Sequence, residues 1–461
     1  MAHQPNARHR SEGESPALSA AEPIAAVSTP PGRGGIGVVR VSGRGAADIA
    51  RHVIGRLPQP RRATLCDFRT SSGELIDRGI ALYFPAPHSY TGEDVLELQA
   101  HGGPLVMRQL LASAVQAGAR IAEPGEFTKR AYLNGRMDLA QAESVADLID
   151  AESEEAARSA ARSLSGEFSR RISAIAQAAL DLRMHVEACI DFPEEEIDPA
   201  DRAELDRKQG KLVQDLDALL AIARQGSVLR EGLTVALVGR PNVGKSSLLN
   251  RLAGEDLAIV TPIPGTTRDY VRATISIEGV PIHLIDTAGL RDTDDPVERI
   301  GVERTWRAIE SAGAAVVIES ATDSLPADES LLARFPCGQP RVRVVNKIDL
   351  VAGGFQRRAT DETVLPTSAK TGEGIEALRG WLLAAAGWKP QAEAVFVARE
   401  RHLRALEEAR LHLIQAREAS QVLDLMAEEL RLAHRALGRI TGEVSADDLL
   451  GRIFASFCIG K

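Results

Sequence analysis

The run Gly239-Arg240-Pro241-Asn242-Val243-Gly244-Lys245-Ser246 has the residue types and the spacing needed to hold a triphosphate. Its glycines let backbone N–H groups curl around phosphate oxygens, and the helix that follows adds positive potential at its N-terminus. Lys245 would neutralise the β- and γ-phosphates, and the Ser246 hydroxyl would bind Mg²⁺. An apolar strand at Leu233–Val238 precedes the run and a helix begins near Ser247–Leu252, as this motif requires. Taken alone, the run could also be a glycine turn with a chance lysine.

A second motif, Asp286-Thr287-Ala288-Gly289, ends the apolar strand Ile282–Ile285. Asp286 can hold Mg²⁺ through water, and the Gly289 N–H can sense the γ-phosphate. In isolation, a turn at the end of a strand would be the simpler interpretation. In this order after the first motif, the pair predicts a P-loop nucleotide-binding domain.

Two further motifs select the base. Asn346-Lys347-Ile348-Asp349 follows the strand Val342–Val345, and the Asp349 carboxylate can accept both N1–H and N2–H of guanine, which adenine cannot supply. Asn346 and Lys347 would support the loop and cover the base, and the Ala369 N–H of Ser368-Ala369-Lys370 can meet guanine O6. The sequence therefore predicts GTP over ATP. The predicted GTP contacts are Asn242, Val243, Gly244, Lys245, Ser246, Ser247, Thr261, Thr267, Asp286, Thr287, Ala288, Gly289, Asn346, Lys347, Asp349, Ser368, Ala369 and Lys370.

The group that orients the attacking water is not evident from these motifs. Many GTPases place Gln directly after Asp-x-x-Gly, but Leu290 stands there, and leucine cannot orient water. The acidic stretch that follows offers several carboxylates, most of which fit a solvated loop equally well. The sequence alone selects none of Asp292, Asp294, Asp295 and Glu298.

Hydrolysis also needs positive charge on the transferring phosphate. Arg268 and Arg291 are candidates, and either could equally be a surface residue. A bound monovalent cation would serve as well, because the loop 261–268 has hydroxyls and carbonyls suited to hard cations. Thr267 is the natural second protein ligand of Mg²⁺, beside Ser246.

Composition excludes several classes of protein. The 461 residues favour two to four domains, with 44% hydrophobic and 26% charged residues as in globular proteins, and a net charge of −9 does not predict a broad basic surface for nucleic acid. The four cysteines are far apart, which indicates neither a zinc site nor disulfides but a reducing, cytoplasmic environment. No apolar run approaches the roughly 18 residues of a membrane helix. A mitochondrial transit peptide at the N-terminus is disfavoured by Glu12 and Glu14.

The predicted architecture is multidomain α/β. β-rich runs at 36–41 and 79–84 and a helix at 105–116 indicate an α+β domain. Alanine, leucine and glutamate then predict long helices over 139–190, and after a Pro-Glu-Glu-Glu break at 191–198 helical character resumes over about 203–224, before a linker at 226–232. After an α/β segment, five apolar residues between Met426 and Ile440 lie on one helix face. The predicted parts are a disordered tail (1–21), an α+β domain (22–137), a helical domain (138–230), a Ras-like GTPase domain (231–388) and a second helical part (389–461), so the helical domain is discontinuous.

With these motifs in place, the chain from about residue 24 to 461 resembles the MnmE (TrmE) family of tRNA-uridine-modification GTPases. The most specific matches lie outside the GTPase motifs. They are Thr29-Pro30-Pro31-Gly32-Arg33-Gly34-Gly35, Ser89-Tyr90-Thr91-Gly92-Glu93-Asp94-Val95, Pro124-Gly125-Glu126-Phe127-Thr128 and Phe457-Cys458-Ile459-Gly460-Lys461.

The resemblance implies an N-terminal folate-binding domain that forms a homodimer. It also implies joint action on tRNA with the FAD protein MnmG in a heterotetramer, using a one-carbon unit from tetrahydrofolate (5-formyl or 5,10-methylene form). By resemblance, K⁺ is held by Asn242, Thr261, Ile263 and Thr266, Glu298 orients water, and folate meets Arg40, Glu97, Arg136 and Lys461. Some members carry Lys where Arg136 stands, which keeps the charge and changes the geometry.

Cys458 is the family's suspected nucleophile, but Phe454, Phe457 and Ile459 around it favour an apolar, buried setting in which a thiol is inert. A regulatory or ribosome-assembly GTPase without modification chemistry shares the nucleotide motifs, and folate binding would separate the two functions.

Overall fold

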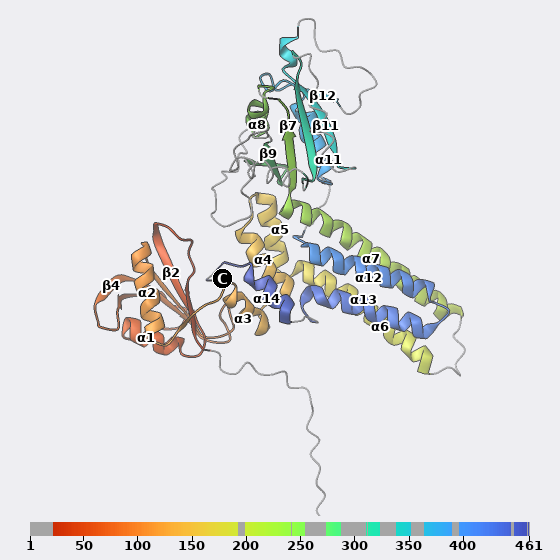
Figure 1. The fold of residues 1–461 in the computed structure, drawn as a ribbon. Coiled ribbons are helices and arrows are strands. Elements are labelled where there is room, and N and C mark those ends of the chain that lie inside the picture. Colours follow the sequence, from red (N-terminus) through yellow and green to blue (C-terminus); the bar gives the residue numbers. More distant parts are fainter. Residues whose placement is uncertain are drawn as a thin grey trace, which may run out of the picture. The chain divides into compact units, whose positions relative to one another are not determined.

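The computed structural model describes residues 22–191, 199–240, 242–253, 273–286, 310, 312–322, 338–351, 364–389, 396–443, 447–458 and 460. The chain divides into two compact units, one made of Met1–Ala142 with Ser445–Lys461 and the other of Glu143–Val444. Figure 1 shows the elements of both units. Among the described residues, no helix is both long and apolar enough to cross a lipid bilayer.

The first unit is built on a six-stranded sheet in the order β3-β4-β5-β2-β1-β6, antiparallel except for the β1–β6 pair. Inward-facing residues of its central strands, such as Val39 and Leu98, are fully buried under α1 and α2. Glycines in the left-handed region flank α1, and Pro104 occupies the first turn of α2. The elements are β1 (Ile24–Val27), β2 (Gly34–Ser42), α1 (Ala46–Ile54), β3 (Thr64–Arg69), β4 (Leu75–Phe84), β5 (Val95–Gly102), α2 (Pro104–Gln116), β6 (Arg120–Ile121), α3 (Glu126–Leu133) and, after the second unit, α14 (Asp447–Ala455).

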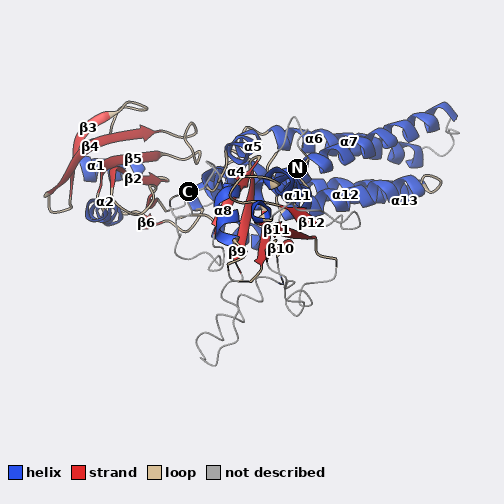
Figure 2. Ribbon diagram, turned by 90° about the horizontal axis from the view of Figure 1, so that it is seen from above, coloured by secondary structure: helices blue, strands red, loops and turns tan. Residues whose placement is uncertain are grey.

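Long helices from both ends of the second unit form a four-helix bundle (Figure 2). The contacting pairs are α6 with α13, α13 with α12, α12 with α7, and α7 with α6, so two helices before the nucleotide segment pack on two after it. The predicted apolar face from Met426 to Ile440 is buried, which explains why α13 packs there. The helices are α4 (Leu139–Ile149), α5 (Glu154–Leu164), α6 (Glu167–Asp191), α7 (Pro199–Glu231), α12 (Glu400–Glu418) and α13 (Leu423–Thr441).

The segment inserted into this bundle carries a second six-stranded sheet in the order β12-β11-β10-β7-β9-β8. All neighbouring pairs are parallel except β8 with β9, the arrangement of a Ras-like domain. The predicted inserted α/β domain is thereby confirmed. Its elements are β7 (Leu233–Val238), α8 (Lys245–Ala253), β8 (Ala273–Ile277), β9 (Val280–Asp286), β10 (Ala314–Ser320), β11 (Arg341–Asn346), η1 (Ile348–Leu350), β12 (Val364–Pro366) and α11 (Ile375–Ala385).

The predicted linker at 226–232 is wrong, because α7 continues to Glu231. Gly226 does not end the helix. It lets the helix approach Phe396 so closely that a Cβ atom on Gly226 would lie 1.5 Å from the Phe396 carbonyl oxygen. Glycine here permits a backbone contact and has no role as a helix breaker, a distinction that only the packing reveals.

We expect Gly226→Ala to destabilise the bundle by about 1–3 kcal/mol, because the added methyl group overpacks this contact. Gly210 lies in the same helix with no atom within 4 Å of its Cβ position. The control Gly210→Ala should therefore stabilise the bundle by about 0.5–1 kcal/mol through helix propensity. Urea titrations followed by circular dichroism at 222 nm compare the two; equal midpoints would contradict the packing argument.

Candidate functional sites

The phosphate-binding loop lies between β7 and α8. Gly244 has a φ of +97°, and a Cβ atom there would lie only 2.3 Å from Asn346 Nδ2. Both the backbone conformation and the lack of space therefore exclude a larger residue at this position. The Lys245 side chain is buried and donates to the carbonyl oxygens of Gly239 (2.5 Å) and Arg240 (3.3 Å). An ammonium held inside such a loop at a helix N-terminus is suited to phosphate. Ser246 and Ser247 are exposed in the first turn of α8.

Hydrogen bonds tie this loop to the two motifs that read the base. The buried Asn346 donates from Nδ2 to Val243 O (3.0 Å), and the ammonium of Lys347 donates to Asn242 O (2.6 Å). Asn346 ends β11 and Lys347 follows it, and the parallel alignment of β11 with β10 and of β10 with β7 brings the strand ends together. The structure therefore assembles the phosphate and base motifs into one site.

The Asp349 carboxylate is exposed and already oriented. Its Oδ1 accepts from Ser368 Oγ at 2.6 Å, and Ser368 Oγ in turn accepts from the Thr371 N–H at 3.1 Å. The Ala369 N–H, expected to meet guanine O6, here donates to Asn346 Oδ1 at 3.1 Å. A base bound at that N–H would have to share or replace this contact. Lys370 is exposed in the following turn.

Part of the predicted site lies outside the described residues. Asp286 ends β9 in register with Leu237 of β7, the strand that leads into the phosphate loop. The predicted positions outside the described residues are Thr261, Ile263, Thr266, Thr267, Thr287, Ala288, Gly289, Glu298 and Lys461.

A second candidate site lies on the first unit's sheet, on the face opposite α1 and α2. Arg40 of β2 and Glu97 of β5 are paired in register, with Arg40 Nη2 2.9 Å from Glu97 Oε1. The Arg40 guanidinium also lies over the rings of Tyr90 (5.4 Å) and Phe127 (5.9 Å). Arg136 is exposed, and its side chain packs against Gly92. The segment from Tyr90 to Gly92 thus connects two predicted folate positions.

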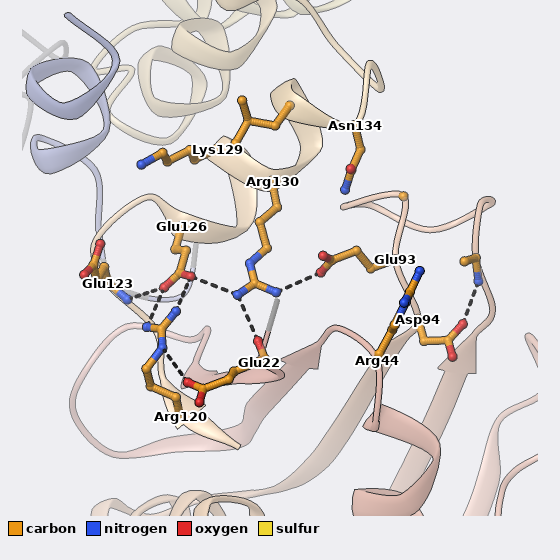
Figure 3. Close-up of a pocket in the computed structure, with 13 residues that line it drawn as sticks. Glu22, Arg44, Glu93, Asp94, Arg120, Glu123, Glu126, Lys129, Arg130 and Asn134 are labelled. Atoms are coloured by element: carbon orange, nitrogen blue, oxygen red, sulfur yellow. Dashed lines mark hydrogen bonds and ion pairs between the residues drawn. The ribbon is translucent and has the colours of Figure 1, made fainter. Parts of the chain in front are cut away.

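A partly buried ion network holds these segments in place (Figure 3). Arg130 of α3 donates to Glu93 Oε2 and to Glu126 Oε1, both at 3.0 Å, and Arg120 binds both oxygens of Glu126. Ser42 at the end of β2 donates to Glu93 at 2.9 Å. The network therefore fixes α3 to the strand that carries Arg40. It lines a pocket of about 700 Å³ that does not include Arg40, Glu97 or Arg136; its residues are Glu22, Arg44, Ala86, Gly92, Glu93, Asp94, Arg120, Glu123, Glu126, Lys129, Arg130, Leu133 and Asn134.

Glu126 gives this network a pH dependence. Burial acts to raise the pKa of its carboxyl, but hydrogen bonds from Arg120, the Glu123 N–H and Arg130 hold the pKa below its ordinary value of 4.5. Because its pKa is lower in the folded state, the ionised carboxylate stabilises the fold at pH values above the pKa of the unfolded state. This stabilisation is lost as the pH falls through the pKa of the folded state. We expect Glu126→Gln to cost about 1–3 kcal/mol at pH 7 and less at pH 3, where part of the contribution of the carboxylate is lost. Thermal melts at both pH values test this, with the exposed Glu74→Gln as control; a pH-independent difference would contradict it.

The C-terminal segment differs from the expected boundary, since Ser445–Lys461 groups with the first unit and not with the helical domain. Aromatic packing provides the reason, because the Phe454 ring lies 6.4 Å from Tyr132 of α3 and 5.4 Å from Phe457. Cys458 was expected to be buried by this apolar setting. The structure corrects that expectation: the phenylalanines are buried and Cys458 is exposed.

All four of the distinctive motifs named above converge in the first unit. Ser28, just before the first motif, donates to Gly460 O at 3.1 Å, and the Gly125 N–H donates to Cys458 O at 3.4 Å. Tyr90 and Thr128 share a hydrogen bond of 2.8 Å. Sequence reasoning assigned no role to Glu93 and Arg130. Their separation of 37 residues carries no periodic signal, and only the family motif around Glu93 could have pointed to them.

The fold and the first site define a P-loop GTPase domain inserted into a helical bundle, preceded by an α+β unit. Comparison with known proteins specifies the family. A family model described as the MnmE helical domain matches residues 139–458, and one described as the GTP-binding protein TrmE N-terminus matches residues 23–136. The chain belongs to the MnmE (TrmE) family, and it is a GTPase that acts in tRNA modification.

Relatives match over nearly their whole length. The tRNA modification GTPase MnmE of Azoarcus sp. (strain BH72) is 59% identical over 95% of this chain and 98% of its own. The protein of the same name from Thiobacillus denitrificans is 58% identical over 95% and 98%. Among solved structures, the G domain of the FeoB iron transporter from T. maritima is 28% identical over 33% of this chain and 98% of its own, with a TM-score of 0.26.

Proposed function

We propose that this GTPase acts with the FAD protein MnmG to add an aminomethyl or carboxymethylaminomethyl group to carbon 5 of the tRNA wobble uridine. The carbon comes from a tetrahydrofolate one-carbon unit. The observation that carries the proposal is the Arg40 guanidinium, which pairs with Glu97 and lies over the rings of Tyr90 and Phe127 from two of the distinctive motifs. A paired charge flanked by aromatic rings suits a flat, polar heterocycle such as the pterin of folate.

The proposal includes a homodimer formed through the exposed face of the first unit's sheet. Leu65 and Ile80 lie on the same face as the Arg40–Glu97 pair and are 59% and 37% exposed. Large exposed apolar residues beside a binding site support an interface there. Folate bound by Arg40, Glu97, Arg136 and Lys461 would then lie at the interface between subunits.

The proposed GTP chemistry uses two cations. Ser246 and Thr267 bind Mg²⁺, with Asp286 acting through water, and K⁺ held by Asn242, Thr261, Ile263 and Thr266 supplies the charge of an arginine finger. Glu298 orients the attacking water. Asn242 has a left-handed φ of 66°, which turns its backbone at the edge of the phosphate loop and supports a ligand role there.

We also propose that Cys458 takes part in the modification chemistry. The Cys458 side chain is exposed, and its backbone carbonyl oxygen accepts a hydrogen bond from the Gly125 N–H, which supports this role. Cys458→Ser should then abolish modification and leave GTP hydrolysis unchanged. Parallel loss of both would point to a structural role.

The deciding experiment measures modified wobble uridine by mass spectrometry after incubating the protein with MnmG, tRNA, GTP, methylene-tetrahydrofolate and a nitrogen donor, either ammonium or glycine. We expect product in K⁺ buffer, little in Na⁺ buffer, and little with Glu298→Ala, which should retain GTP affinity. Absence of folate binding together with undiminished GTP hydrolysis would favour a regulatory GTPase instead.

A further inference from the structure

The chain crosses twice between the helical bundle and the inserted nucleotide domain. The outward crossing is the end of α7, where Glu231 is followed after one residue by β7. The return crossing includes residues 396–399, which lead directly into α12. These two crossings are the covalent routes by which a change of orientation of the nucleotide domain reaches the bundle.

One buried carboxylate holds both crossings. Asp147 of α4 has a side chain only 6% exposed, and its Oδ1 accepts from Arg230 Nε of the outward crossing at 2.8 Å. The same Oδ1 accepts from Arg399 Nη2 of the return crossing, also at 2.8 Å. Removing this carboxylate would take the shared counter-ion from two arginines and would free the outward crossing from α4, whereas Arg399 would keep its bond to Glu143 O of α4 at 3.1 Å.

Glu143, one turn earlier on the same face of α4, anchors the arrangement in the bundle. Its side chain is 1% exposed and binds Arg401 through both oxygens, at 2.7 and 2.6 Å, while His402 Nε2 lies 2.8 Å away. Arg401 also donates to the carbonyl oxygens of Arg439 (3.0 Å) and Ile440 (3.2 Å) near the end of α13. α4, α12 and α13 therefore form one tied body.

The two crossings are also in contact with each other. Besides the close approach of Gly226 to the Phe396 carbonyl oxygen, Gln225 donates to Gly387 O at 3.0 Å and accepts from the Lys389 N–H at 2.8 Å. Phe396 is fully buried. Packing fixes the distance between the crossings, while Asp147 fixes both of them to α4.

The helical domain holds the nucleotide domain at one further point, the turn of the β8–β9 hairpin. Ser153, the N-cap of α5, donates to Gly279 O at 2.8 Å, and His283 Nε2 lies 3.2 Å from Glu231 O. In sequence, β8 follows the predicted Thr267 ligand and β9 ends at Asp286, so the hairpin connects both segments expected to sense the γ-phosphate. The turn at the other end of the hairpin is attached to the helical domain close to the contacts of Asp147.

We infer that Asp147 is a positioning residue that couples the nucleotide state of the inserted domain to tRNA modification by fixing both chain crossings to α4. The inference rests on the proposed function. With Asp147 present, movement of the nucleotide domain turns the bundle with it. Without this carboxylate, GTP is still bound and hydrolysed, but the movement is absorbed where the outward crossing is released and the return crossing is held more weakly.

Asp147→Asn tests the inference, because it removes the charge and keeps the volume. Each variant is expressed in cells from which the gene has been deleted. Modified tRNA nucleosides are quantified by mass spectrometry, and GTP hydrolysis is measured on the purified full chain. We expect kcat and KM for GTP within about twofold of wild type, and modification reduced about 5–150-fold, the range of common coupling energies. Asp147→Glu should restore part of the modification.

Two controls separate coupling from simple loss of stability. Glu407→Gln breaks the exposed Arg224–Glu407 pair between α7 and α12 without touching the Asp147 contacts, and should change neither readout. Ile172→Val removes one methyl group from a buried position of α6, lowering stability by about 0.5–1.5 kcal/mol without touching the ion cluster. Should Asp147→Asn fail to fold, Arg230→Gln and Arg399→Gln each release one crossing and should reproduce the uncoupling.

Retained modification in Asp147→Asn, or an equal fall in hydrolysis and modification, would overturn the inference. The deletion strain distinguishes this failure from failure of the proposed function. If deletion itself leaves every tRNA nucleoside unchanged, the modification role fails; if deletion removes a nucleoside that Asp147→Asn retains, only the coupling role fails.

Discussion

Lys245→Ala is expected to abolish GTP binding at concentrations that saturate the wild-type protein. The buried ammonium now donates to Gly239 O and Arg240 O, and with nucleotide bound it would donate to the β- and γ-phosphates. Two charged hydrogen bonds of about 1.5–3 kcal/mol each correspond to a loss of roughly 10²–10⁴-fold in affinity. Equilibrium titration with a fluorescent GTP analogue measures this loss directly.

The control for this substitution is Lys129→Ala, which removes a half-buried lysine from the pocket of the first unit and leaves the phosphate loop intact. It should bind GTP as wild type does. If Lys245→Ala retained GTP affinity within about tenfold of wild type, a difference of only about 1.4 kcal/mol, the loop would not be the phosphate cradle that its backbone and lysine indicate.

Asp349→Asn should remove the preference for guanine. The Asp349 carboxylate is oriented by Ser368 Oγ at 2.6 Å, so it is ready to accept two N–H groups from the base. An amide presents one acceptor and one donor, and the donor would face the guanine N2–H group. We expect GTP affinity to fall by about 1.5–3 kcal/mol, roughly 10–150-fold, in competition titrations with GTP and ATP.

Xanthosine triphosphate provides the matched test of this geometry. Xanthine carries a C2 oxygen where guanine carries the N2 amino group, so the side-chain amide introduced by Asp349→Asn would donate to that oxygen. The variant should therefore prefer xanthosine triphosphate to GTP, which also shows that it is folded. A variant that loses both nucleotides equally would indicate collapse of the loop rather than altered recognition.

Local patterns in the sequence predicted most of the nucleotide site. A strand, a glycine turn and Lys245 are contiguous, so short-range sterics and hydrogen bonding dictate their arrangement. The same holds for α13, whose buried face repeats at helical spacing from Met426 to Ile440. The linker predicted near Gly226 failed because glycine is ambiguous: the same residue can end a helix or allow a close contact.

The sequence by itself determined that this chain grips a guanine nucleotide and that helices flank the nucleotide domain, because those properties reside in short contiguous motifs and periodic faces. The tertiary structure decided which distant residues share an environment. It placed the Phe454 ring on Tyr132, so that the C-terminus joins the first unit and Cys458 stays exposed. It also brought Arg230 and Arg399 to one carboxylate. Long-range pairings of this kind depend on how the elements pack, and no local spacing encodes them.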